Sequence, residues 1–163
     1  MKIGVISDTH DNLEAIREIF ARYADEGIDT VIHLGDLISP FVARIVGELF
    51  RGKLYLVLGN NDGDRLFLRE VLEKAGFELI RSPAELEIAG RKLAVMHEPV
   101  FVDALARSGF YDAVLYGHTH RTDLRLEAGT LVLNPGEACG YLTGKATYAF
   151  LDLEALKAEV REV

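Results

Sequence analysis

Hydrophobic and polar residues alternate with two different periods along the first half of the chain. Short runs that are apolar at nearly every position predict strands at residues 3–6, 30–34 and 53–58. Segments with apolar residues at every third or fourth position predict helices at residues 12–25, 40–50 and 64–75. Ser39 and Pro40 are suited to begin the second helix, and Gly76 is suited to end the third. This order of strands and helices predicts a parallel sheet with helices packed on it.

The second half of the chain is richer in short strands. Gly90 and Arg91 are expected to connect a hairpin-like pair of strands, and a short helix is expected at residues 102–108. The strands predicted in this half span residues 84–89, 92–96, 113–116, 124–127, 130–133 and 147–153. Strand-rich sequence after a strand–helix half predicts a second sheet packed on the first, with helices outside. The apolar triplet at residues 131–133 favours burial on both faces.

Composition favours one globular domain over residues 1–163. Hydrophobic residues make up 49% of the chain, and single cores typically comprise about 100–200 residues. No apolar run approaches the roughly 18 residues that a membrane span requires, and no secretory signal is recognised at the start. The single cysteine, Cys139, excludes an internal disulfide and fits a reducing compartment, so a cytoplasmic location is expected.

The net charge of −8 limits the classes of partner. Surfaces that bind nucleic acids in general are normally basic, so such a surface is not expected, and neither is a membrane partner. A small phosphate-containing substrate remains compatible with the charge, because bound cations can invert the local field.

Residues able to bind metal ions follow five of the predicted strands. Considered singly, each segment has an ordinary alternative, namely a capped turn, a glycine-containing turn or a packed buried histidine. Sites in open α/β sheets form where strands end, so five such segments in one chain favour a shared metal site over five unrelated turns. His33 lies within a strand and is expected to be a packed or supporting residue. The candidate ligands are Asp8, His10, Asp36, Asn60, His97, His118 and His120.

The motifs Asp-x-His, Gly-Asp, Gly-Asn, a lone His and Gly-His-Thr-His, in this order, resemble the calcineurin-like metallophosphoesterase superfamily. The short length and the segment at residues 134–136, Asn-Pro-Gly, resemble its small single-domain phosphodiesterase branch. The resemblance implies an α/β fold, a four-layer αββα sandwich of two mixed β-sheets flanked by helices, with a dimetal site at one edge. It places Asp8, His10, Asp36 and His120 on one ion. It places Asp36 as the bridge to a second ion, which also takes Asn60, His97 and His118.

This resemblance implies a metal-dependent phosphodiesterase acting on a small substrate. A hydroxide bridging two divalent ions about 3.5–4 Å apart would attack the phosphorus in line. Manganese is the first expectation, with nickel, iron, cobalt and zinc as alternatives, because mixed nitrogen and oxygen ligands bind all of these. Asn60 and Asn61 are expected to contact the substrate. The residues expected in catalytic roles are Asp36, Asn60, His97 and His118.

Three positions depart from the family pattern. Asn61 replaces a histidine that many relatives have after Gly-Asn; an amide cannot act as a general acid, so substrates with good leaving groups are expected. Glu98 follows His97 where the family often has glycine, and its carboxylate is expected to point away from the metals. Glu137 replaces a common serine, which leaves its part at the substrate rim open.

Other functions remain as alternatives. One is a non-catalytic interaction scaffold resembling a retromer subunit, although every ligand position here holds a competent residue. Others are a phosphomonoesterase and a protein phosphatase. A homo-oligomer is an alternative to a monomer. Five aromatic residues are assigned to core packing in preference to a partner surface: Phe41, Phe50, Phe101, Phe110 and Tyr111.

Overall fold

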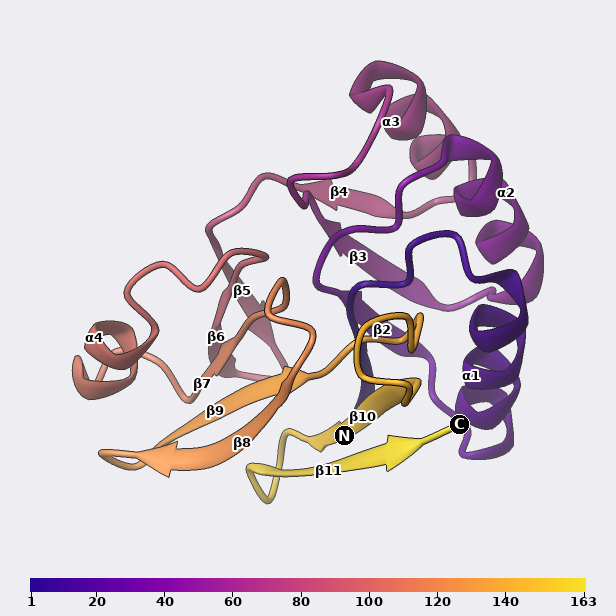
Figure 1. Cartoon of the computed structure of the whole chain (residues 1–163). Helices are drawn as coiled ribbons and strands as arrows, with labels where there is room; N and C mark the ends of the chain where they lie inside the picture. The colour runs from indigo at the N-terminus through magenta and orange to yellow at the C-terminus, as the bar shows by residue number, and fades with distance from the viewer.

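Two mixed β-sheets lie against each other in the computed structural model, which describes residues 1–163 (Figure 1). The first sheet contains β1 (Lys2–Ile6), β2 (Thr30–His33), β3 (Lys53–Val57), β4 (Glu78–Ile80), β10 (Thr147–Asp152) and β11 (Lys157–Glu162). The second contains β5 (Ala84–Ile88), β6 (Arg91–Val95), β7 (Ala113–Leu115), β8 (Thr122–Glu127) and β9 (Thr130–Pro135). Their spatial orders are β11-β10-β1-β2-β3-β4 and β5-β6-β7-β9-β8. Strands β1 to β4 are parallel, as are β6, β7 and β9, whereas β10, β11, β5 and β8 pair antiparallel with their neighbours.

Helices cover the outer face of each sheet (Figure 1). They are α1 (Leu13–Asp25), α2 (Pro40–Leu49) and α3 (Arg65–Lys74) on the first sheet and α4 (Val102–Arg107) on the second. Asn12, Ser39 and Asp64 each cap the helix that follows, by accepting a hydrogen bond from a backbone N–H of its first turn. None of the four helices has the length and apolar character needed to cross a membrane.

The core consists of three apolar layers. One lies between the first sheet and its helices, where Phe20 and Leu68 are buried. A second lies between the two sheets, where Val5 packs in the same cluster as Leu93. The third lies between the second sheet and α4 and includes Val114. The predicted αββα sandwich is therefore confirmed, and its two sheets are close enough for their strand ends to share an edge.

The predicted elements differ from the observed ones in three respects. Strand β10 joins the first sheet beside β1 instead of the second sheet. Strands β4 and β11 were not predicted, because β4 has only three residues and β11 alternates charged and apolar residues without an apolar run. The β5–β6 turn is formed by Ala89 and Gly90, not by Gly90 and Arg91. Both turn residues have positive φ, 51° and 75°, as a two-residue hairpin turn of the I′ type requires.

The assignment of five aromatic residues to the core is correct for two of them. Phe50 is buried, and Tyr111 packs partly buried against the α4 layer. Phe41, Phe101 and Phe110 are instead 66%, 76% and 74% exposed. These three lie in the first turn of α2 and in the loops on either side of α4.

Candidate metal centre

The ends of five strands bring the predicted ligands to one edge of the molecule. Neighbouring parallel strands β1, β2 and β3 of the first sheet deliver the loops that carry Asp8, Asp36 and Asn60. Neighbouring strands β6 and β7 of the second sheet deliver His97 and His118. The ligands therefore come from two facing sheets, three strands from one and two from the other, and not from five adjacent strands of a single sheet.

The loops at this edge hold an uncommon backbone conformation. Asp8, His10, Asp36, His118 and His120 all have positive φ, between 39° and 68°, which is rare for residues other than glycine. Backbone hydrogen bonds support it: Asp8 N–H donates to the Gly35 carbonyl at 3.0 Å, and His10 N–H donates to that of Asp36 at 3.0 Å. Strain of this kind persists where surrounding structure enforces it, commonly at functional sites.

Glycine at position 35 permits the two sheets to approach each other here. Its φ is +101°, and a Cβ on it would lie 2.6 Å from His97 Nδ1. A side chain at Gly59 would likewise collide with the Asp36 carboxylate. The Gly-Asp and Gly-Asn motifs thus need their glycines because backbone and ligand side chains are in contact.

The first group of candidate ligands consists of Asp8, His10 and His120. Asp8 Oδ1 lies 3.9 Å from His10 Nε2 and 3.5 Å from His120 Nε2. Both distances exceed those of good hydrogen bonds. Asp8 Oδ1 and His10 Nε2 are also buried without any hydrogen-bond partner. Two buried polar atoms that face each other without bonding are a costly arrangement unless a further group lies between them.

The second group consists of Asn60, His97 and His118. Asn60 Oδ1 lies 2.9 Å from both His97 Nε2 and His118 Nδ1. His97 Nδ1 lies 2.8 Å from the Leu34 carbonyl oxygen, which can only accept, so Nδ1 carries a proton. In neutral His97 the lone pair of Nε2 therefore faces the Asn60 oxygen. A second proton on His97 or a metal ion between these two atoms would make this contact favourable.

Asp36 lies between the two groups. Its Oδ2 atom is 3.5 Å from His10 Nε2 and 3.4 Å from His97 Nε2, so one oxygen faces both groups. Burial would raise the pKa of Asp36, but contacts with His97 and Asn61 outweigh it and hold the pKa below its ordinary value. At Asp8 burial prevails instead and raises the pKa, despite the hydrogen bond from Ser7 Oγ. A nearby cation would favour the charged form of both carboxylates.

The spacing of these atoms suits divalent ions. Two donors each about 2.1 Å from one ion lie about 3.0–3.4 Å apart in octahedral or tetrahedral geometry, close to the distances found here. A third cluster of possible ligands consists of His120, Glu137 and Cys139. Its members are hydrogen-bonded to one another, and burial raises the pKa of Cys139 to about 12, which keeps the thiol protonated.

Glu137 supports the first group of candidate ligands, a role that the sequence did not reveal. It is fully buried, so it does not belong to the substrate rim. Its Oε2 accepts a hydrogen bond from His120 Nδ1 at 2.7 Å, which leaves His120 Nε2 free to face Asp8. It also accepts hydrogen bonds from Leu142 N–H and the Thr143 hydroxyl. Burial opposes its charge, but these contacts prevail and lower its pKa to about 2.

Asp62 is a second supporting residue that the sequence did not reveal, because it lies in a segment typical of ordinary turns. Its buried carboxylate accepts hydrogen bonds from the backbone N–H groups of Asp36, Ile38 and Gly59, at 3.2, 2.9 and 2.7 Å. It thereby joins the loop after β2 to the loop after β3. His33 is buried as expected, and contacts the Thr9 hydroxyl at 3.0 Å.

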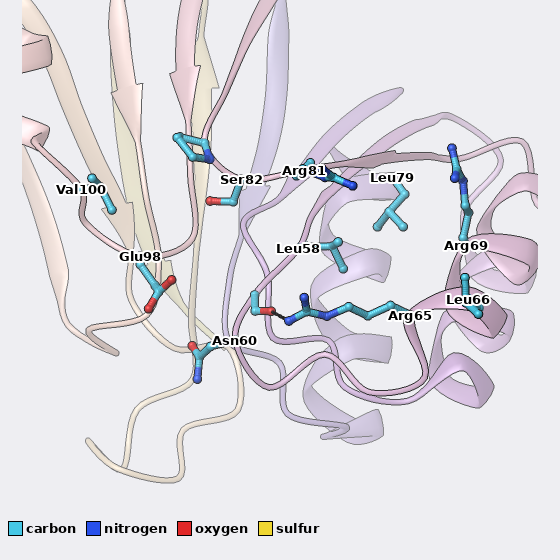
Figure 2. Close-up of a pocket in the computed structure, with 12 residues that line it drawn as sticks. Leu58, Asn60, Arg65, Leu66, Arg69, Leu79, Arg81, Ser82, Glu98 and Val100 are labelled. Carbon is cyan, nitrogen blue, oxygen red and sulfur yellow. Dashed lines mark hydrogen bonds between the residues drawn. The ribbon is translucent and has the colours of Figure 1, made fainter.

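The two remaining departures from the family pattern lie beside the ligands. Asn61 donates from Nδ2 to Asp36 Oδ2 at 2.7 Å and from its backbone N–H to Asp36 Oδ1 at 2.9 Å. Its side chain is therefore engaged with a candidate ligand. Glu98 is exposed and belongs to none of the ligand clusters. It lines a neighbouring cavity on the same side as Asn60 (Figure 2).

Comparisons with known proteins concern the whole chain and its family. Residues 1–156 match the family model for the calcineurin-like phosphoesterase superfamily domain. The chain is 42% identical to phosphodiesterase MJ0936 of Methanocaldococcus jannaschii over 166 residues, covering 100% of this chain and 98% of that protein. The solved structure of an archaeal phosphodiesterase matches all of both chains at 37% identity, with a TM-score of 0.94.

A more distant structure shares the fold alone. Vps29 of Entamoeba histolytica, solved in complex with zinc, is 21% identical and covers 100% of this chain and 99% of its own, with a TM-score of 0.69. The family match spans nearly the whole chain, and the phosphodiesterase relative is about twice as similar in sequence as Vps29. The chain belongs to the calcineurin-like phosphoesterase superfamily.

Proposed function

We propose that this chain is a metal-dependent phosphodiesterase whose centre is formed by the six ligand residues of the two groups together with Asp36. The observation that carries the proposal is the position of Asp36, one oxygen of which faces both groups, the first of which contains two buried polar atoms without a hydrogen-bond partner. Two divalent ions held there would lower the pKa of a water for in-line attack and stabilise the charge that develops on the phosphate oxygens. Manganese is the first choice of metal, since nitrogen and oxygen ligands suit it along with nickel, iron, cobalt and zinc.

The chain's own residues would divide the remaining work. Asp36 would be shared by the two groups, and Glu137 would fix the ring of His120 so that Nε2 faces inward. Asn60 and Asn61 would border the substrate phosphate, since both are exposed at this edge. A diester is favoured over a monoester because two divalent ions, the carboxylates of Asp8 and Asp36 and one hydroxide sum to about +1, which matches a diester monoanion.

The absence of a histidine at position 61 shapes the expected substrates. No residue among the exposed neighbours of the centre is an evident proton donor for the leaving group, and Asn61 is committed to Asp36. A positioned general acid typically contributes about 10²–10⁴-fold. Rates should therefore fall steeply as the leaving group becomes more basic.

Metal reconstitution tests the proposal. Purified protein is stripped with a chelator, reloaded with manganese and analysed for metal content. We expect about two ions per chain and hydrolysis of bis(p-nitrophenyl) phosphate only after reloading. The monoester p-nitrophenyl phosphate and a diester with an alkyl leaving group serve as comparison substrates and should react more slowly. Full activity in stripped protein, or efficient turnover of the alkyl diester, would contradict the proposed chemistry.

A further inference from the structure

A cavity opens directly beside the candidate metal centre. Its volume is about 600 Å³, and Asn60 forms part of its wall. One side is formed by α3 and the ends of β3 and β4, and the other by the segments around Ser82 and Glu98 (Figure 2). Small-molecule sites typically have volumes of about 300–1,000 Å³, so this cavity is large enough for a substituent of nucleoside size.

The charge of this cavity is opposite to that of the whole protein. Three arginines line it, Arg65, Arg69 and Arg81, against a single carboxylate, that of Glu98. The chain as a whole carries a net charge of −8. Figure 2 shows the three arginines grouped around Leu58 and Leu79, with Glu98 at the other side beside Asn60. The cavity is thus cationic at one end and apolar along its floor.

Two of the arginines have guanidinium groups that are able to bind an anion. Arg65 is held in place by backbone carbonyls: its Nη2 donates to Gly59 at 3.2 Å and its Nε donates to Asp62 at 3.4 Å. These partners are neutral and leave its charge uncompensated. Arg81 forms no ion pair or side-chain hydrogen bond in the structure. Arg69, in contrast, already pairs with Glu73 at 3.0 Å on the exposed side of α3.

We propose that this cavity binds an ester arm of the substrate that carries a second phosphate group. This inference rests on the proposed function. Because Asn60 belongs both to the second ligand group and to the cavity wall, an arm of a diester bound at the centre enters the cavity directly. Leu58 and Leu79 contact the organic part of the arm. Arg65 and Arg81 bind the second phosphate, since guanidinium groups match phosphate oxygens in charge and geometry.

The reaction itself leaves the second phosphate unchanged. Water attacks the diester phosphorus, the bond from phosphorus to the leaving oxygen breaks, and a proton passes to the departing alcohol or phenol. The product is a bisphosphate, because the organic arm now carries two phosphate monoesters. Binding energy gained at a group remote from the reacting bond raises kcat/KM for the substrates that carry it.

A matched pair of substrates tests the inference. One is thymidine 5′-(p-nitrophenyl phosphate), and the other is the same molecule with a 3′-phosphate. Both release p-nitrophenol from the same diester. We expect kcat/KM of manganese-loaded protein to be at least tenfold higher for the 3′-phosphorylated substrate. Arg81→Ala and Arg65→Ala should each reduce this ratio at least threefold. Arg17→Ala, an exposed arginine of α1 outside the cavity, should leave the ratio unchanged.

Calorimetric titration separates this inference from the proposed function. Thymidine 3′,5′-bisphosphate should bind the metal-loaded protein at least tenfold more tightly than thymidine 5′-phosphate, and Arg81→Ala should remove most of the difference. Such binding without any diester hydrolysis would support the cavity and contradict the phosphodiesterase. Equal affinities, or a difference that persists in both arginine variants, would overturn the cavity assignment whatever the activity.

Discussion

The candidate metal centre and the arginine-lined cavity share Asn60 but are built in opposite ways. The centre consists of short side chains fixed by strand ends, backbone in the left-handed region and buried carboxylates. The cavity consists of long exposed side chains carried by α3 and by the segments after β4 and β6. The first arrangement fixes distances between atoms, as bond-making chemistry requires. The second supplies charge and apolar surface, and is suited to selecting among substrates. Substitutions in the two regions should therefore differ in the size and in the kind of effect.

The largest effect is expected at Asp36. Asp36→Asn keeps the shape of the side chain but removes the charge that faces both groups. Because ions at such sites supply several kcal/mol of transition-state stabilisation, kcat should fall on the order of 10³-fold or more. Elemental analysis should show less bound metal in the same variant. His120→Ala, which removes a donor of the first group, should behave similarly.

Asp25→Asn is the matched control for Asp36→Asn. Asp25 is an exposed residue at the end of α1, so this substitution makes the same chemical change at a position away from the centre. It should retain both metal content and turnover. Near-normal kcat in Asp36→Asn, with normal folding by circular dichroism, would break the distinction between the two regions.

A smaller effect is expected at Glu137, which acts on the centre through His120. In Glu137→Gln the neutral amide is a weaker acceptor for His120 Nδ1–H, so Nε2 becomes a poorer donor. Loss of such a partner typically costs 10–100-fold in metal affinity, and a competition titration with a chelator measures it. Glu85→Gln on β5, an exposed position, is the control. A change in kcat/KM at saturating metal with unaltered metal affinity would show that Glu137 acts in another way.

The difference between the two regions also explains what the sequence could predict. All seven candidate ligand positions could be proposed because each lies in a short motif directly after an apolar strand, and the structure brings these residues together. The supporting roles of Glu137 and Asp62 were not predicted because a buried supporting carboxylate has the same sequence context as one in an exposed turn. The arginines of the cavity are spread over α3 and the segment after β4, without periodicity or a shared motif. Only the folded chain places them together.

The prediction of the fold from the sequence was limited in the same way. The strand and helix alternation of the first half correctly predicted its parallel sheet, since each element there has a continuous apolar face. The position of β10 was missed because pairing with β1 joins residues near opposite ends of the chain, Lys2 with Asp152. Local periodicity identifies a strand but does not choose its neighbour. The exposed Phe101 and Phe110 show likewise that apolar character does not by itself determine burial.

The pH dependence of stability tests how tightly the loops of the centre are packed. Burial lowers the pKa of His33 to about 4, from an ordinary value of 6.5. Between these values the unfolded chain binds more protons, so this contribution to stability is present above pH 6.5 and is lost as the pH falls towards 4. The free energy of unfolding should drop by about 1 kcal/mol from pH 7.5 to 5.5 through this residue. Urea denaturation measures it as the difference between wild type and His33→Asn, which should lack this dependence. A difference that does not vary with pH would mean that His33 can be protonated in the folded state.

The smallest effect is expected at Glu98, where the two regions meet. Its side chain is exposed to water, so its repulsion of an anion is weak; unit charges 4 Å apart in water interact by only about 1 kcal/mol. With bis(p-nitrophenyl) phosphate, Glu98→Gln should change kcat/KM less than about threefold, because this substrate places no second anion in the cavity. With the 3′-phosphorylated thymidine diester it should raise kcat/KM a few-fold, since the one negative charge that lines the cavity is removed. Glu85→Gln should alter neither value. A gain of more than threefold that is equal for both substrates would instead mean that the Glu98 carboxylate faces the metal centre. Glu98 would then belong to the metal centre and not to the cavity.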